Sequence, residues 1–369
     1  MVAIETETLR RLADCPRAHT PTRLEIGDGW LRVLPHERDR FVRADVEGAL
    51  GAELGEYEVD FATLRRFLLS VSAGTTQLGI EGGRLTAKAE GSNLSIPLRA
   101  ATSIANVATD VTVAEFVIEV PLPFEVLAQA AELLPYVSTD ETRPTLCNVS
   151  VESDGADLVC VATDTHKCGA IRFAGLGQSE KALLPADALR RFGKLFNGEE
   201  GGLRLQFTAS QTWGCLRGER GLSFGWRPCE GAFPDWRKVI PEGAAGTTVQ
   251  MPVAKALAAL RTALAADDGS HRVTISKEDV LGGSATFVHN GHECQSGTEW
   301  AGVVWVGPQE TVDLNGVYLG QIIRAHRALG AKEVRLLVNG PLEPVRVESV
   351  EPPKVPATDF RSVVMPMQK

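Results

Sequence analysis

The sequence predicts an α+β protein built from one repeated unit, in which a helix is followed by short antiparallel strands. The first observation is a cadence that recurs six times: an apolar residue, four turn-forming or short side chains, and then usually leucine. The second observation is that amphipathic helical patterns follow the cadence, and alternating apolar residues follow the helices. Such regular spacing indicates one supersecondary unit used repeatedly. The copies begin at Ile4, Val59, Leu122, Leu184, Met251 and Leu314.

The length of the chain indicates how these units are grouped. A chain of 369 residues is too long for a single hydrophobic core. Pairing the six units gives three domains, residues 1–112, 113–246 and 247–369. In each domain we expect two helices packed on antiparallel sheets.

Each cadence is predicted to end a strand and begin a helix. Phe116, Ile118 and Val120 alternate as in a half-buried strand, and Pro121 and Pro123 are expected to end that strand and start the next helix. The last helix is predicted to begin at Asn315, a good helix cap, and to end at Gly330. Its predicted buried face contains Leu319, Ile322, Ile323, His326 and Leu329.

Strand patterns follow the helices. The segment LCNVSVESDGADLVCVATD alternates on both sides of SDGAD and predicts a hairpin. The segments LRLQFTAS, RVTIS and VRLLVNG are also typical of strands, and TRLEIGDGWLRV is a less regular example.

Composition indicates the compartment of the protein. No apolar run is long enough to span a membrane, and the N-terminal residues lack the apolar core of a signal peptide. The seven cysteines are odd in number and form no CxxC motif, which favours reduced thiols over a disulfide framework. We therefore expect a cytoplasmic protein.

Basic residues concentrate on five of the six predicted helices, although the formal net charge of the chain is −9. The third helix is the exception, because it carries Glu125 and Glu132. The basic residues either form ordinary solvated faces or together contact DNA phosphates without reading bases. The negative net charge argues against indiscriminate binding of nucleic acid through the whole surface. The helix cations are Arg10, Arg11, Arg65, Arg66, Arg190, Arg191, Lys194, Lys255, Arg261, Arg324 and Arg327.

Five segments carry a resemblance to a known family. They are RPTL (residues 143–146), VATDTHKCG (161–169), GAFPDWRKVIP (231–241), LNGVYL (314–319) and VVMPMQ (363–368). In this order they resemble the bacterial DNA sliding clamp, the beta subunit of DNA polymerase III. The resemblance covers the middle and C-terminal thirds, whereas in residues 1–112 only length, repeat phase and stretches such as VDFATLRRFL agree.

The resemblance implies a non-catalytic processivity factor for DNA replication. Two chains, each with three clamp domains, would close head to tail into a six-domain ring around duplex DNA, with the helices lining the hole. Such a homodimer would tether the polymerase catalytic subunit and repair polymerases through short peptide motifs, and would need a separate ATP-driven clamp loader. It would require no cofactor. The helix cations other than Arg11, together with Arg143, become the DNA-facing candidates.

The family's peptide-binding pocket, carried over by position, combines apolar and polar side chains. Methionines adapt to varied apolar partners, and Asn315, His166 and Tyr318 can bind polar groups of a peptide. Thr165 stands where the family usually has glycine, Cys168 where it has an aliphatic residue, and Gln368 where a basic residue is frequent. The expected pocket residues are Leu146, Thr163, Thr165, His166, Lys167, Cys168, Pro234, Lys238, Val239, Asn315, Tyr318, Val363, Met365, Pro366, Met367 and Gln368.

The same alignment indicates the contact that closes the ring. Leu94 and Ile96 of the first domain would meet Leu264 and Ala265 of the partner's third domain.

Other functions were weighed against this one. A divergent accessory clamp for repair or recombination would keep the fold and change the partners. A cytosolic hydrolase could be centred on Asp164, His166 and Cys168. His289, His292 and Cys294 offer loosely spaced zinc donors, but no fourth ligand is evident, and we predict no metal. No GxxxxGK[ST] or GxGxxG motif supports nucleotide hydrolysis.

Overall fold

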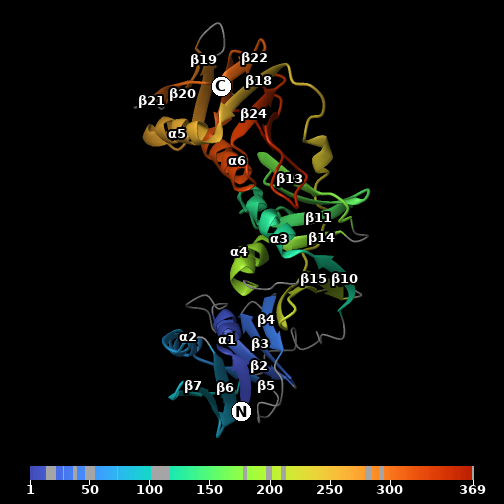
Figure 1. Ribbon diagram of the computed structural model, residues 1–369, viewed down its shortest axis with the longest axis vertical. Helices are drawn as coiled ribbons and strands as arrows, with labels where there is room; N and C mark the ends of the chain where they lie inside the picture. Colours follow the sequence, from blue (N-terminus) through green and yellow to red (C-terminus); the bar gives the residue numbers. More distant parts are fainter. Residues whose placement is uncertain are drawn as a thin grey trace. The chain divides into compact units, whose positions relative to one another are not determined.

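The computed structural model describes most of the chain (Figure 1). The described residues are 1–13, 22–27, 29–35, 40–45, 55–72, 74–100, 116–177, 181–196, 202–208, 213–278, 284–290 and 295–367. They form two compact units: Met1–Phe124 with Arg191–Pro228, and Glu125–Arg190 with Cys229–Lys369.

The predicted repeat is present six times in the described residues, as a strand, a helix and three further strands. The first repeat contains β1 (Val2–Glu5), α1 (Thr6–Ala13), β2 (Thr22–Gly27), β3 (Trp30–Pro35) and β4 (Arg40–Asp45). The second contains β5 (Gly55–Glu58), α2 (Phe61–Ser70), β6 (Thr75–Glu81), β7 (Arg84–Ala89) and β8 (Ser92–Pro97), followed by β9 (Arg99–Ala100).

The middle repeats add short 3-10 helices. The third contains β10 (Phe116–Leu122), α3 (Phe124–Ala130), η2 (Ala131–Tyr136), η3 (Pro144–Cys147), β11 (Asn148–Asp154), β12 (Asp157–Thr163) and β13 (Lys167–Phe173). The fourth contains β14 (Ala182–Pro185), α4 (Ala186–Leu195), β15 (Leu203–Thr208), β16 (Gly214–Arg217) and β17 (Leu222–Trp226), and η4 (Trp236–Lys238) follows it.

The last two repeats complete the chain. The fifth contains β18 (Thr247–Pro252), α5 (Val253–Ala263), η5 (Leu264–Ala266), β19 (Arg272–Lys277), β20 (Ser284–Asn290) and β21 (Gln295–Ala301), and β22 (Val304–Val306) follows it. The sixth contains β23 (Thr311–Asn315), α6 (Gly316–Ala328), β24 (Glu333–Val338), β25 (Val345–Ser349) and β26 (Asp359–Val364).

The helix starts confirm the cadence found in the sequence. Each α-helix begins two residues after the first residue of its copy, from Thr6 after Ile4 to Gly316 after Leu314. The four strand segments that followed clear patterns also form strands, including the hairpin of β11 and β12.

Consecutive repeats exchange their first strands. In the first pair of repeats, β1 pairs with β6 and β5 pairs with β2. In the second pair, β10 pairs with β15 and β14 with β11. In the third pair, β18 pairs with β24 and β23 with β19. The repeats therefore interlock two by two, and we propose that each pair forms one domain, 1–112, 113–246 and 247–369.

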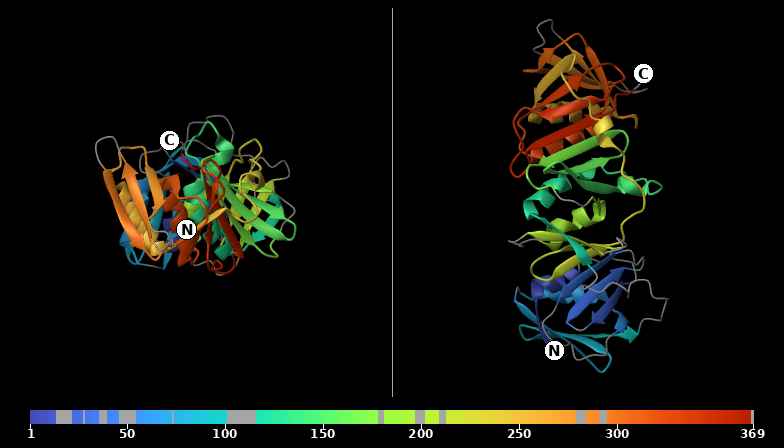
Figure 2. Two further views of the ribbon diagram at one scale, coloured as in Figure 1. Left: turned by 90° about the horizontal axis from the view of Figure 1, so that it is seen from above. Right: turned by 90° about the vertical axis from the view of Figure 1, so that its right-hand side faces the viewer.

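Each unit contains one large and one small sheet. In the first unit the strand orders are β10-β15-β16-β17-β4-β3-β2-β5-β9 and β1-β6-β7-β8. In the second they are β14-β11-β12-β13-β26-β25-β24-β18-β22 and β21-β20-β19-β23. The large sheet of the second unit joins green strands of the third repeat to red strands of the sixth (Figure 2).

Both large sheets are joined in the same way. The last strand of one repeat pairs antiparallel with the last strand of another, β4 with β17 and β13 with β26. The two remaining last strands, β8 and β21, end their sheets among the described strands.

The helices pack in pairs within the units. Helix α1 packs on α2, and α5 packs on α6. The rings of Phe124, at the start of α3, and Phe192, in α4, lie 4.6 Å apart. No helix in the described part of the chain is long and apolar enough to cross a bilayer.

Helix α6 follows its sequence closely. The Asn315 side chain accepts a hydrogen bond from the Tyr318 backbone N–H at 3.0 Å, and Gly330 ends the helix at a φ of 106°. The predicted apolar face is buried, whereas Arg324 and Arg327 are exposed.

Two local expectations were wrong. Pro121 does not end its strand, because β10 continues to Leu122 and Pro121 stays in register opposite Arg204. The helix after it is also shorter than expected. It changes to the 3-10 form at Ala131, so Glu132 lies in η2 together with Pro135. Proline cannot donate the backbone bond that a longer α-helix would need.

The core behind α6 contains a neutral histidine. His326 is fully buried, and its two ring nitrogens each lie 2.8 Å from a serine hydroxyl, that of Ser349 and that of Ser362. Burial lowers the pKa of His326 to about 3. Both nitrogens are satisfied without a proton charge, so the group serves packing.

The acid dependence of stability tests this burial. In the unfolded chain the imidazole takes up a proton below about pH 6.5, whereas the folded site resists protonation down to about pH 3. His326 therefore removes stability as the pH falls between these values. From about pH 6.5 to about pH 4.5 the loss in unfolding free energy should be about 2 kcal/mol. The variant His326→Gln should lack this component in urea unfolding; an equal acid loss in both proteins would contradict a neutral His326.

Candidate functional site

The turn between β12 and β13 is fixed by its own side chains. The Asp164 Oδ1 atom accepts hydrogen bonds from the backbone N–H groups of His166 and Lys167, both at 2.9 Å. The Asp164 Oδ2 atom pairs with the Lys167 Nζ at 2.6 Å, and the exposed fractions of the two side chains are only 12% and 5%. The turn therefore presents His166 in a defined position.

Thr165 occupies the strained position of this turn. Its φ of 78° lies in the left-handed region, which costs a residue with a Cβ atom about 1–2 kcal/mol. The Thr163 hydroxyl partly offsets this cost, because it accepts from the Thr165 N–H at 3.1 Å and donates to the Lys167 carbonyl at 2.8 Å. Glycine would adopt this φ without that cost.

Two chain segments converge on this turn. The C-terminal segment is attached to it, because the Met365 N–H donates to the His166 carbonyl at 2.8 Å. The Tyr318 ring, from α6, stacks on His166 with centroids 6.1 Å apart, and the Lys167 Nζ lies 4.0 Å from the centre of the same ring. Burial, together with the charge of Asp164, raises the pKa of Tyr318. The phenol therefore stays protonated and can donate a hydrogen bond.

The C-terminal segment continues along the sixth repeat. The Met367 N–H donates to the Asp313 carbonyl at 2.9 Å, and Pro366 forms a bridge opposite Leu314. Met365, Pro366 and Met367 are all partly exposed. The backbone of this segment is held by hydrogen bonds, so its partly exposed apolar side chains can contact a bound partner.

Residues 233–240 form another side of the candidate site. Phe233, Trp236 and Ile240 pack on a cluster that includes Cys168 and Val363. The Glu152 carboxylate holds this segment in place, because it accepts from the Trp236 Nε1 at 2.6 Å and from Arg237 at 2.8 Å. Because these residues anchor the segment, its remaining side chains can face solvent. Pro234, Lys238 and Val239 are exposed.

The predicted pocket residues divide into a buried layer and an accessible layer. Leu146, Thr163, Lys167, Cys168 and Val363 are buried. Thr165, His166, Pro234, Lys238 and Val239 are exposed, and Asn315, Tyr318, Met365, Pro366 and Met367 are intermediate. Contacts link the turn, α6 and the C-terminal segment directly. Leu146 lies in η3, before β11, and its place in the pocket stays a prediction; Gln368 lies outside the described residues.

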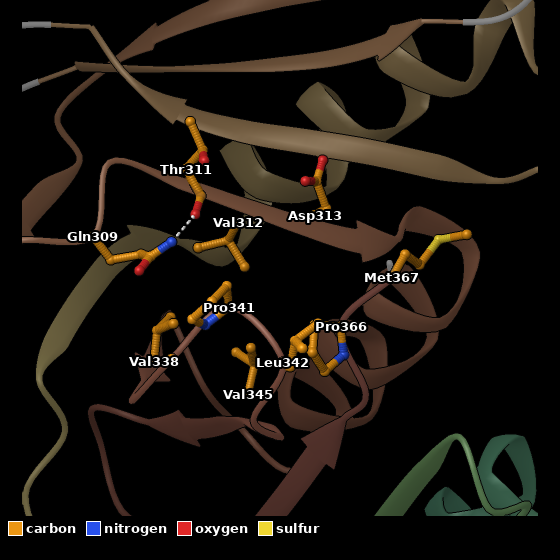
Figure 3. A pocket seen from close by; sticks show the side chains of 11 residues that line it. Gln309, Thr311, Val312, Asp313, Val338, Pro341, Leu342, Val345, Pro366 and Met367 are labelled. Carbon is orange, nitrogen blue, oxygen red and sulfur yellow. Dashed lines mark hydrogen bonds between the residues drawn. The ribbon is translucent and has the colours of Figure 1, made fainter. Parts of the chain in front are cut away.

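An open pocket of about 510 Å³ adjoins the C-terminal segment (Figure 3). Pro366 and Met367 form one side of it, and Gln309 together with residues of the sixth repeat forms the rest. The latter residues were not predicted from the sequence. Their only sequence signal was the turn-forming NGPLEP stretch, in which Leu342 is 61% exposed. The missed lining residues are Gln309, Thr311, Val312, Asp313, Val338, Gly340, Pro341, Leu342 and Val345.

The hydrolase hypothesis is wrong. Cys168 pairs with Val363 inside the sheet and is 1% exposed. Burial raises the pKa of the Cys168 thiol, and likewise that of Cys160, to about 12. A thiol with such a pKa is not a nucleophile at neutral pH. Asp164 is also unavailable to orient His166, because its oxygens bind the turn and Lys167.

Most of the predicted DNA-facing residues are exposed. Arg65, Arg66, Arg143, Arg190, Lys194, Lys255, Arg261, Arg324 and Arg327 are exposed, and Arg10 and Arg191 are intermediate. Arg10 has a structural role in α1, because its guanidinium donates to the carbonyl oxygens of Leu68 and Val71 at 2.8 and 2.5 Å. It therefore links α1 to the end of α2.

The predicted dimer residues lie in two kinds of element. Leu94 and Ile96 are in β8, the last strand of its sheet, and Ile96 is buried. Leu264 and Ala265 are in η5, where Leu264 is partly buried and Ala265 is exposed.

The chain is similar in sequence to bacterial beta sliding clamps. The chain is 25% identical to the beta sliding clamp of Treponema pallidum over 236 residues, which are 63% of this chain and 60% of that protein. It is 29% identical to the beta sliding clamp of Staphylococcus aureus over 108 residues, 29% of this chain and 28% of that protein. The chain thus matches less than two thirds of the length of these relatives. No protein-family model matches it.

Solved structures extend the similarity over the whole chain. The beta subunit of DNA polymerase III from Thermotoga maritima superposes with a TM-score of 0.80 at 17% identity, covering 100% of this chain and 99% of that one. The beta subunit from Pseudomonas aeruginosa gives a TM-score of 0.80 at 18% identity and covers 100% of both chains. The resemblance to bacterial sliding clamps is confirmed, and the chain has their α+β fold.

Proposed function

We propose that this protein is a DNA sliding clamp, a non-catalytic processivity factor that encircles duplex DNA. The observation that carries the proposal is the repeat itself: one strand–helix–strands module occurs six times, and five of its six helices carry basic residues. A surface assembled from many such helices suits weak, sequence-independent contact with phosphates. Encirclement would then keep the protein on DNA even though each contact is weak. A net charge of −9 is compatible with this kind of binding.

Two sheet edges that have no partner among the described strands support closure of the ring by a second copy. Inside the chain, last strands of repeats pair antiparallel at two joints, β4 with β17 and β13 with β26. The last strands β8 and β21 end their sheets. Pairing of β8 from one copy with β21 from another would repeat the same joint, and two copies would close it head to tail. Exposed backbone donors and acceptors at such edges favour this pairing.

The site built from the β12–β13 turn, α6 and the C-terminal segment is the proposed docking site for partners. His166, Tyr318 and Asn315 offer polar groups, whereas Val239, Met365 and Met367 offer adaptable apolar contacts. A short peptide segment with apolar anchors fits this combination. The polymerase catalytic subunit, repair polymerases and the clamp loader would dock here. Adjacent lining residues such as Leu342 extend the surface available to them.

Topological binding predicts how the protein behaves on DNA. Once loaded, the protein should remain on closed circular DNA during gel filtration and leave after the circle is cut, because only free ends release a ring.

Replacing Arg190 and Lys194 by glutamate should slow loading by the clamp loader. It should also lower the slope of the logarithm of binding against the logarithm of salt concentration by about 2, since each lost phosphate contact contributes about 0.9.

A matched control separates this effect from net charge. Lys88 and Lys332 are exposed and lie outside the α-helices. The Lys88→Glu/Lys332→Glu protein should load normally. Equal loading of both double variants at low and high salt would show that Arg190 and Lys194 do not face DNA.

Ring closure predicts a change in subunit number. Leu264→Arg should place a charge in the proposed contact with β8 and shift the protein from dimer to monomer in sedimentation. Leu342→Arg changes an equally apolar but more exposed residue outside that contact, and should leave the dimer intact. A Leu264→Arg protein that stays dimeric would reject this contact.

The peptide site predicts an effect of truncation. Because β26 ends at Val364, removal of residues 365–369 leaves the strand complete. The truncated protein should remain dimeric but lose at least about tenfold in affinity for polymerase-derived peptides, which calorimetry measures. Removal of Lys369 alone is the control and should preserve binding. Undiminished affinity after the longer truncation would refute the site.

A further inference from the structure

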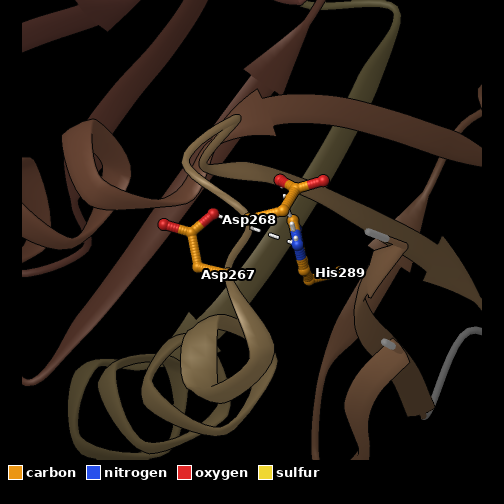
Figure 4. A group of neighbouring side chains, drawn as sticks. All are labelled: Asp267, Asp268 and His289. Carbon is orange, nitrogen blue, oxygen red and sulfur yellow. Dashed lines mark ion pairs between the residues drawn. The ribbon is translucent and has the colours of Figure 1, made fainter. Parts of the chain in front are cut away.

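A second group of polar side chains lies in the fifth repeat, apart from the peptide site. Asp267 and Asp268 follow η5, and His289 is in the neighbouring strand β20 (Figure 4). One donor atom from each residue can be chosen so that all three lie within 4.8 Å of one another. In the sequence, His289 is grouped with His292 and Cys294 as loosely spaced zinc donors. The latter two lie outside the described residues, and the structure places His289 beside two carboxylates instead.

One ring nitrogen of His289 has a hydrogen-bond partner, and the other has only longer contacts to carboxylates. Its side chain is completely buried, and its Nδ1 lies 2.7 Å from the Arg272 carbonyl oxygen. A carbonyl oxygen accepts only, so Nδ1 carries a proton. The Nε2 atom has no hydrogen-bond partner and faces the aspartates. Leaving a buried polar atom unmatched costs about 1–3 kcal/mol, so this arrangement requires an explanation.

The distances distinguish a direct bond from a shared ion. The His289 Nε2 lies 3.5 Å from the Asp268 Oδ1 and 3.9 Å from the Asp267 Oδ1. A charged hydrogen bond from an imidazolium to a carboxylate would measure about 2.7–2.9 Å. Two ligands of one tetrahedral zinc ion, with bonds of about 2.1 Å, lie about 3.4 Å apart. The observed spacing is therefore too long for a hydrogen bond and close to that of ligands around one ion.

The loop fixes the positions of both carboxylates. The Asp267 Oδ1 accepts hydrogen bonds from the Gly269 N–H at 3.2 Å and from the His271 N–H at 2.9 Å. The Asp268 Oδ1 accepts from the Ser270 N–H at 3.0 Å. His271 also contacts the Asp267 Oδ2, so a second histidine orients the carboxylate.

We propose that Asp267, Asp268 and His289 bind a divalent transition-metal ion, with Zn²⁺ as the best fit. One imidazole nitrogen and two carboxylate oxygens are typical ligands of zinc, whereas Ca²⁺ and Mg²⁺ prefer oxygen ligands alone. The Asp268 side chain is 27% exposed, which gives the ion access from solvent and leaves room for a water as fourth ligand. The bound ion would attach the loop 267–271 to β20. This inference does not depend on the proposed function.

Zinc titration of the full-length chain tests the site. After removal of metal with a chelator, calorimetry should show one equivalent of Zn²⁺ bound, and Co²⁺ should give the visible absorption of a tetrahedral site. Asp268→Asn should weaken binding at least about tenfold, because it removes the charge of a direct ligand. His289→Gln should do the same. Asp268 is partly exposed, so its variant decides the result even if the buried His289 variant does not fold.

Two controls exclude other zinc donors. Ser270→Ala keeps the backbone N–H that bonds Asp268 and removes only the hydroxyl, which accepts from the Arg272 N–H, so this variant should bind zinc normally. Cys294→Ser removes the nearest thiol in the sequence and should also bind normally. Absence of zinc uptake by the unmodified protein, full uptake by Asp268→Asn, or loss of uptake only in Cys294→Ser would each overturn the proposal.

Discussion

The exchange of first strands between consecutive repeats is the interaction on which the rest of the structure depends. A single repeat has a first strand, a helix and three further strands. The first strand, which leads into the helix, pairs with the sheet of the neighbouring repeat, as β23 does with β19. The backbone hydrogen bonds of that strand therefore fix the start of the following helix. In the sixth repeat this places Asn315, at the end of β23, as the cap of α6 and Tyr318 beside His166. The positions of Asn315 and Tyr318 in the proposed peptide site thus follow from the pairing of the strands.

The second constraint is that sheet edges need partners. The chain satisfies two such edges internally with the same antiparallel joint, in which no helix or loop intervenes. The β13–β26 joint also brings the third and sixth repeats together, so Lys167 lies opposite Val364 and the Met365 N–H reaches the His166 carbonyl. The proposed peptide site is therefore assembled at a joint, from segments almost two hundred residues apart in sequence. The proposed peptide site and the proposed closure of the ring would therefore both depend on strand joints of the same kind.

Much of the fold could be predicted from the sequence because local pattern and tertiary pairing agree in the repeats. The six helix starts and the buried face of α6 follow from residues that are neighbours in the chain. The predictions that failed concern residues whose environment is set by parts of the chain that are distant in sequence. Pro121 was expected to end a strand, yet a strand that reaches its neighbour opposite Arg204 tolerates it. The role of Glu152 in anchoring Trp236 joins residues far apart in the chain, and no local pattern signals it. Leu342 and the rest of the pocket beside Met367 were missed for the same reason, because they meet only after the sheet has formed.

The two buried histidines show why burial alone does not identify a functional residue. His326 and His289 are both fully enclosed in the third proposed domain. The two nitrogens of His326 meet serine hydroxyls, which can donate or accept, so a neutral ring fills its site completely. His289 has one fixed acceptor at Nδ1 and two carboxylates facing Nε2, and carboxylates cannot donate to it when they are ionised. A neutral ring therefore leaves lone pairs facing lone pairs, and only a positive charge between them resolves the repulsion. The spacing of 3.5 and 3.9 Å leaves room for that charge to be a metal ion bound by all three side chains.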